Sequence, residues 1–155
     1  MLTGTLSEPT LSVSPWFEAR RTAYYDALFG VSARGDWDTY IAFFAEGIKE
    51  SAHGTLRQML ALVEVQESMR QVIRESSLRA ETAFTLVDHA VANPSFTVDS
   101  AAHALDVSQN HARQTIRKLT ELGVLVEIDP SAYRRRYFAP AVLNVLLGRS
   151  ATPHR

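Results

Sequence analysis

The stretch that decides the fold is residues 95–139, SFTVDSAAHALDVSQNHARQTIRKLTELGVLVEIDPSAYRRRYFA. Asp99 is of a residue type that caps helices, and a short helix is predicted after it over residues 100–105. An Asp-Val-Ser turn follows, and a longer helix is predicted over residues 109–122. Gly123 can adopt the left-handed conformation that ends helices. The stretch therefore begins as helix, tight turn and helix.

Two β-prone segments come after the second helix. They cover residues 124–128 and 133–139, and the sequence Asp-Pro-Ser-Ala at residues 129–132 between them is typical of a turn. Helix, tight turn, helix and hairpin is the order in which a winged helix-turn-helix presents its second helix to a DNA groove. We therefore predict a mainly α fold that ends in a winged helix-turn-helix with a small β-hairpin wing.

The longer helix has two faces of opposite character. When its residues are plotted at about 100° each, the apolar ones fall on one face, namely Ala112, Ile116, Leu119 and Leu122. The other face gathers side chains that suit nucleic acid, because Arg pairs with guanine, Asn and Gln pair with adenine, and Lys adds positive charge. These candidate DNA-binding residues are Gln109, Asn110, Arg113, Gln114, Arg117 and Lys118.

The second β-prone segment carries a cluster of positive charge. Arg134, Arg135 and Arg136 stand between Tyr133 and Tyr137, and their guanidinium groups are candidates for contacts with flanking phosphates or the minor groove. A second interpretation is a solvated helix face beside a charged strand that discourages pairing at a sheet edge. Winged helices also serve as protein–protein modules, so the fold alone does not decide between DNA and a protein partner.

Composition narrows the classes of protein. The 155 residues are 46% hydrophobic and 21% charged, which is typical of one or two globular domains. The net charge is −1, so DNA binding would have to come from local clusters of charge. The sequence has no cysteine, which excludes disulfides, zinc–cysteine sites and a thiol nucleophile. There is neither an apolar run of the ~18 residues that a membrane span needs nor a signal-peptide pattern, so we expect a cytoplasmic protein.

The pattern of helices predicts three parts. A helical segment covers residues 1–76, the winged helix-turn-helix covers residues 77–148, and residues 149–155 form a flexible tail. Ser76 and Ser77 mark the boundary between the first two parts.

Three helices are predicted in the first part. One runs over residues 16–31 with Ser14 as its cap, the next is capped by Asp36, and a long one covers residues 53–76. The aromatic residues of this part are predicted to form a core; exposed, they would favour dimers or poor solubility. They are Trp16, Trp37, Phe43 and Phe44.

Two further helices complete the winged part. One is predicted over residues 80–92 and is stopped by Asn93 and Pro94. The other is predicted over residues 141–147, after Pro140 and before Gly148.

Two blocks of sequence match a known family in order and spacing. The first block is Leu6-Ser7-Glu8-Pro9, Ser14-Pro15-Trp16-Phe17-Glu18, Tyr24-Tyr25-Asp26-Ala27-Leu28, Gly35-Asp36-Trp37 and Phe43-Phe44-Ala45-Glu46-Gly47-Ile48. The second is Tyr137-Phe138-Ala139-Pro140 with Leu143 and Leu146. The first resembles the helices after the active-site loop of Fic-domain proteins, which transfer nucleotide monophosphates to hydroxyl groups of target proteins. The second is similar to the end of the winged-helix module of many bacterial Fic proteins.

The catalytic signature of that family is absent from these residues. The signature is a His, Pro-Phe, two residues and Gly-Asn-Gly-Arg, in which the His is the general base and the loop and the Arg hold phosphates. No histidine here is followed by such a loop, so no catalytic residue carries over and no cofactor is implied; the histidines are His53, His89, His103, His111 and His154.

The predicted function is therefore non-catalytic DNA binding, with transcriptional regulation or autoregulation as its role. The alternative is the non-catalytic, C-terminal half of a Fic-type nucleotidyltransferase, whose winged module contacts targets or other subunits. The partners expected are double-stranded DNA and either a second copy of the chain or a missing N-terminal catalytic half, and no membrane.

Other polar residues favour structural roles. His53 and His89 stand alone on helices, and His103 and His111 flank the predicted turn, so no metal site is expected. Glu46 and Glu50 lie one turn apart and are interpreted as a solvated face rather than a cation site. Gly47 and Gly54 are expected to allow close helix packing or a break.

Overall fold

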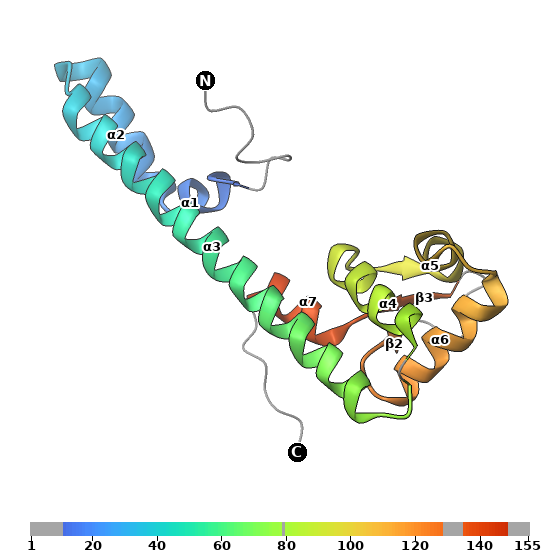
Figure 1. The fold of residues 1–155 in the computed structure, drawn as a ribbon. Coiled ribbons are helices and arrows are strands. Elements are labelled where there is room, and N and C mark those ends of the chain that lie inside the picture. The colour runs from blue at the N-terminus through green and yellow to red at the C-terminus, as the bar shows by residue number, and fades with distance from the viewer. Residues whose placement is uncertain (1–10, 79, 129–134, 149–155) are drawn as a thin grey trace, which may run out of the picture. The chain divides into compact units, whose positions relative to one another are not determined.

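The computed structural model describes residues 11–78, 80–128 and 135–148, and the fold is mainly α (Figure 1). Across these ranges the chain has seven helices and a small three-stranded antiparallel sheet near the C-terminus. The chain divides into two compact units, Met1–Met59 and Leu60–Arg155. The predicted coarse class, mainly α with a little β structure, is confirmed.

Some predictions concern residues outside the described ranges. They are the motif at residues 6–9, the turn at residues 129–132, the side chains of Tyr133 and Arg134, and the tail at residues 149–155.

The first unit begins with two helices where one was predicted. Helix α1 is Ser14–Ala19 and helix α2 is Arg21–Arg34, and they are separated at Arg20, whose backbone is not helical (φ −122°, ψ 32°). The N-cap of α1 is Val13 and makes no side-chain hydrogen bond, so the prediction of Ser14 as the cap is wrong. The rings of Trp16 and Phe17 in α1 pack against Phe43, which belongs to the third helix, α3 (Trp37–Glu75).

Helix α3, Trp37–Glu75, is one helix of 39 residues where two were predicted. At 1.5 Å per residue it is roughly 58 Å long. Gly54 does not interrupt it, because a single glycine costs a helix only about 1 kcal/mol relative to alanine. The predicted start is confirmed: Gly35 has φ 65° and Asp36 Oδ1 accepts a hydrogen bond from the Thr39 N–H at 3.2 Å.

Gly47 allows α1 to pack closely on α3. A Cβ atom at this position would lie 2.9 Å from ring atoms of both Trp16 and Phe17, so any larger residue would push α1 away. The prediction of close packing is confirmed for Gly47. Gly54 has nothing within 4 Å of its would-be Cβ.

The predicted aromatic core of the first unit forms only in part. Trp16, Phe17 and Phe43 are half-buried, with ring centroids 5.0 Å apart for Trp16–Phe43 and 5.8 Å for Phe17–Phe43. Trp37 is 58% exposed and Phe44 is 39% exposed, so the prediction that they are core residues is wrong. The ring of Phe44 touches the edge of the α1 contact, 5.2 Å from the ring of Phe17, and much of it stays exposed, whereas Trp37 has its ring contact with Tyr40 of its own helix.

The second unit contains the main hydrophobic core. Its elements after α3 are α4 (Glu81–Ala92), β1 (Phe96–Thr97), α5 (Val98–Leu105), α6 (Gln109–Glu121), β2 (Val126–Glu127), β3 (Arg136–Phe138) and α7 (Pro140–Leu146). The largest fully buried side chains are Ile73, Leu86, Val87, Ile116, Leu119, Leu125 and Val142. They come from the end of α3, from α4, α6 and α7, and from the segment after α6, so the end of α3 belongs to this core.

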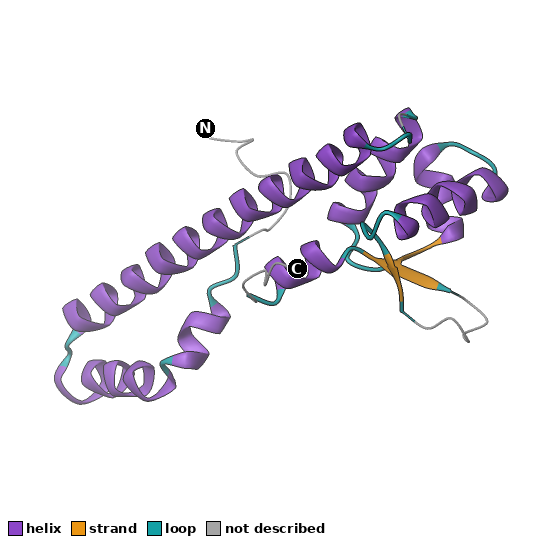
Figure 2. Ribbon diagram, turned by 90° about the horizontal axis from the view of Figure 1, so that it is seen from below, coloured by secondary structure: helices purple, strands orange, loops and turns teal. Residues whose placement is uncertain are grey.

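The sheet has one strand more than the predicted hairpin (Figure 2). Its order is β1-β3-β2, with Phe96 opposite Tyr137 and Val126 opposite Phe138. Strand β1 has two residues, which is too short for the alternating pattern by which strands are predicted.

Side-chain caps fix the first turns of the two helices predicted on either side of the tight turn. Thr97 Oγ1 accepts the Ser100 N–H at 3.3 Å, so Thr97 is the cap of α5 and the assignment of Asp99 as the cap is wrong. Ser108 Oγ accepts the His111 N–H at 3.3 Å and caps α6. Gly123, with φ 73°, has the predicted left-handed conformation after α6. None of the helices in the described ranges is long and apolar enough to cross a bilayer.

Candidate nucleic-acid interface

Helix α6 is anchored by one face and leaves the other face exposed. Ala112, Thr115, Ile116 and Leu119 are buried, whereas the predicted inward residue Leu122 is 37% exposed because it follows the last helical turn. The six side chains of this helix that were predicted to bind DNA are all exposed, because they lie opposite the buried face. They are Gln109, Asn110, Arg113, Gln114, Arg117 and Lys118.

A concave surface, which encloses a volume of about 900 Å³, lies between α6 and the sheet. Gln109, Arg113 and Arg117 line it from α6, and Arg135 lines it from the segment that leads into β3. The fold thus brings together four candidates that are up to 26 positions apart in the sequence. Asn110, Gln114 and Lys118 lie outside this surface on the same exposed half of the helix.

Acidic side chains border the same surface and engage two of its arginines. Arg135 Nε lies 3.2 Å from Glu127 Oε1, and this buried oxygen accepts no hydrogen bond from the residues that the structure describes. Arg117 Nε lies 3.6 Å from Glu121 Oε1 in an exposed pair. In contrast, the side chain of Arg113 makes no ion pair or hydrogen bond with any residue that the structure describes.

Arg136 is held by the strand pairing. Its Nε donates to Ser95 Oγ at 2.8 Å and its Nη2 donates to the Ser95 carbonyl at 3.2 Å. These two bonds fasten β3 to the residue that precedes β1. Sequence reasoning missed this contact because the two residues are 41 positions apart. The third predicted arginine, Arg134, lies outside the described residues.

Two histidines of this unit, His89 and His111, contact neighbouring helices. His89 Nε2 lies 3.0 Å from Ser100 Oγ, its Nδ1 lies 3.2 Å from the Asn93 amide, and its ring packs edge-on against Phe96. Burial lowers the pKa of His89 from its usual value, because it disfavours the charged ring. His111 Nε2 lies 3.4 Å from Thr82 Oγ1. In the described ranges, no group of three His, Cys, Asp or Glu side chains is arranged to hold a metal ion.

The glutamates of α3 that were weighed as a cation site pair with their own helix. Glu46 Oε2 lies 3.2 Å from Lys49 Nζ, and Glu50 Oε1 lies 3.9 Å from His53 Nδ1. Both are exposed pairs one turn apart, which fits a solvated face.

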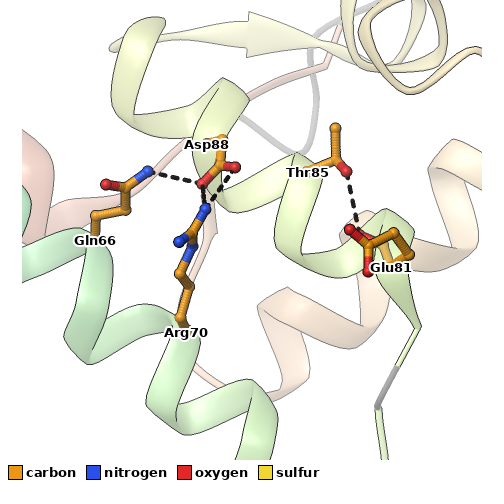
Figure 3. A network of polar contacts seen from close by, with 5 residues as sticks. All are labelled: Gln66, Arg70, Glu81, Thr85 and Asp88. Atoms are coloured by element: carbon orange, nitrogen blue, oxygen red, sulfur yellow. Dashed lines mark hydrogen bonds and ion pairs between the residues drawn. The ribbon is translucent and has the colours of Figure 1, made fainter.

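A polar network fastens α4 to α3 within the second unit (Figure 3). Arg70 Nη2 donates to both carboxylate oxygens of Asp88 at 2.7 Å, and Gln66 Nε2 donates to Asp88 Oδ1 at 2.7 Å. On α4 itself, the Thr85 hydroxyl donates to the Glu81 carbonyl at 3.2 Å. The network sets the position of α4, against which α5 and α6 pack.

We expect Asp88→Asn to lower the free energy of unfolding by about 0.5–1.5 kcal/mol, because it removes the charge that faces a partly buried Arg70. Both side chains remain about a third or more exposed, which keeps the effect modest. Urea unfolding followed by circular dichroism measures the difference. Glu67→Gln is the matched control, since the Glu67–Arg74 pair is more exposed, and should cost less than about 0.5 kcal/mol. An equal loss in both variants would contradict a special role for Asp88.

A search against models of known protein families finds none that matches this chain. The resemblance to Fic proteins therefore stays a prediction from the two sequence blocks.

Proposed function

We propose that this chain is a non-catalytic DNA-binding protein, in which residues 77–148 form a winged helix-turn-helix and α6 enters the major groove. The observation that carries the proposal is the exposed half of α6. It presents amide and cationic side chains together on a helix whose opposite face is buried, beside a concave surface that contains Arg135. Amides and guanidinium groups on one helix face are what base edges in the major groove require.

The proposed roles follow from the contacts of each side chain. Arg113 has no partner among the described residues, and it shares the exposed half of α6 with Asn110 and Gln114, so these three are the candidates for base contacts. Arg117 and Lys118, nearer the end of the helix, suit phosphates. On binding, Arg135 would leave its ion pair with Glu127 and contact a phosphate instead. Arg136 would contribute positive charge from a position fixed by its hydrogen bond to Ser95.

The test is a salt titration of binding to labelled duplex DNA. We expect the dissociation constant to rise steeply with salt, because binding releases about 0.9 cation for each phosphate contacted. Arg135→Ala should weaken binding to all duplexes alike and reduce the log–log salt slope by about one per chain. The combined change of Arg134, Arg135 and Arg136 to alanine should reduce binding further.

Arg57→Ala is the matched control for this titration. It removes the same charge from an exposed position on α3 in the first unit and should leave both affinity and slope unchanged. An absence of binding at low salt would overturn the proposed function. Equal losses in the Arg57 and Arg135 variants would show that only net charge matters.

A further inference from the structure

Helix α3 carries a line of large apolar side chains that the first unit covers only in part. Exposed fractions along this line range from 39% to 58% within residues 37–59. The residues recur at intervals of three and four positions, with Ala52 filling the one gap: Trp37, Ile41, Phe44, Ile48, Leu56 and Met59. We call these six residues and Ala52 the α3 stripe.

The α3 stripe has the geometry of a helix–helix seam. At about 100° per residue its members fall within an arc of roughly 120°, and at 1.5 Å per residue the stripe is about 33 Å long. The contact with α1 is centred on a neighbouring face, through Gly47 and Phe43, and of the stripe only Phe44 borders it, with its ring 5.2 Å from that of Phe17. Spacings of three and four are those by which side chains of one helix fit between those of a neighbour. The stripe therefore suits another long helix.

The exposed area matches the size of a stable interface. Tyr25 and Phe29 of α2 add two large exposed side chains to the same unit, at 54% and 65%. Taking about 200 Å² for a fully exposed large side chain, these two and the large residues of the stripe offer roughly 800 Å². Specific complexes bury about 800 Å² on each partner. The large residues of the stripe alone offer roughly 600 Å², which is at the upper end of the largest apolar patch on an ordinary monomer.

We propose that a second copy of this chain packs on the α3 stripe and forms a homodimer through paired α3 helices. A two-fold dimer places the same patch on both partners, so the patch must be complementary to its own copy. A stripe of uncharged apolar side chains is, because two copies of it pack together without repulsion. The charged residues of α3 within residues 37–59 are of both signs, so two copies do not repel along its flanks: Asp38, Glu46, Lys49, Glu50 and Arg57. The proposal rests on the first unit alone and does not depend on DNA binding.

The first test is the mass of the chain in solution, measured by sedimentation equilibrium. We expect twice the chain mass of 17.3 kDa at micromolar concentration. Ile41→Asp with Ile48→Asp should weaken dimerisation by on the order of 100-fold or more, because charges would be buried without partners. Circular dichroism should show retained helix, since both positions are exposed within the chain.

A matched variant separates the stripe from general charge effects. Thr39→Asp with Arg57→Gln changes the net charge by the same amount at exposed positions on another face of α3, and should leave the dimer intact. Dissociation in this variant would overturn the assignment of the interface. A wild-type chain that stays monomeric up to about 100 µM would overturn the proposal, and a partner segment of different sequence would then be the occupant.

Crosslinking supplies an independent readout. The chain has no cysteine, so Ile48→Cys introduces the only thiol. Ile48 is the midpoint of residues 37–59, so the two copies of it meet whether the helices pair parallel or antiparallel. We expect a disulfide-linked dimer under mild oxidation, and crosslinking no better than that of Arg57→Cys would contradict the proposal. DNA titration of the monomeric variant is measured separately, so failure of one proposal leaves the other standing.

Discussion

Replacing Leu119 by alanine is expected to lower the free energy of unfolding of the second unit by about 2–5 kcal/mol. Leu119 is fully buried at the inward face of α6, within the cluster that also contains Ile116 and Leu125. Truncation removes apolar contacts and leaves a cavity that neighbouring helices fill only in part. Because domains of this size are stable by about 5–15 kcal/mol, the loss is a large share of the total.

Leu122→Ala is the matched control for this prediction. It makes the same chemical change three positions later, where the side chain is 37% exposed, and should cost less than about 1 kcal/mol. Urea unfolding monitored at 222 nm compares the two. Equal losses would contradict the orientation of α6 on which the proposed DNA contact depends, because that orientation separates the buried face from the exposed one.

The parts of the fold that sequence predicts well are those set by local chemistry. Helix α6 follows from the Ser108 cap, from apolar residues at helical spacing and from Gly123 after its end. The exposure of its six candidate residues follows from the same spacing, since burying one face of a helix exposes the other. The start of α3 is also set by a local contact, the hydrogen bond from the Thr39 N–H to Asp36 Oδ1.

Contacts between distant residues gave no sequence signal. Strand β1 exists because β3 pairs with it, and the bonds from Arg136 to Ser95 join positions 41 apart. The pairing of Arg135 with Glu127 was likewise missed, although it decides whether that arginine is available to a phosphate. Three adjacent arginines look equivalent in a sequence, yet the two that the structure describes have different partners.

The prediction of the core of the first unit was wrong where it depended on the spacing of apolar residues alone. Trp37 and Phe44 have the spacing of a buried helix face, and spacing alone does not show whether the covering partner belongs to the same chain. The continuity of α3 past Gly54 is a related case, because a glycine weakens a helix without ending it.

Arg113→Ala is expected to reduce the affinity for a preferred duplex by about 10- to 100-fold while changing the affinity for unrelated duplexes much less. The reason is that a guanidinium group that reads guanine through two hydrogen bonds contributes about 1–3 kcal/mol of discrimination. Arg113 is the arginine of α6 whose side chain has no partner among the described residues, so it reaches a base without first breaking an ion pair. The measurement selects a preferred sequence from random duplexes with the wild-type chain and then compares dissociation constants for that sequence and a scrambled one.

Arg135→Ala is the contrasting variant in the same comparison. It should weaken binding to the preferred and scrambled duplexes by a similar factor, because a phosphate contact carries no sequence information. If the two variants lost sequence preference equally, the division between base contacts on α6 and phosphate contacts beside the sheet would be wrong. If Arg113→Ala lost only general affinity, α6 would lie along the phosphate backbone, and its amide side chains at Asn110 and Gln114 would not be reading bases.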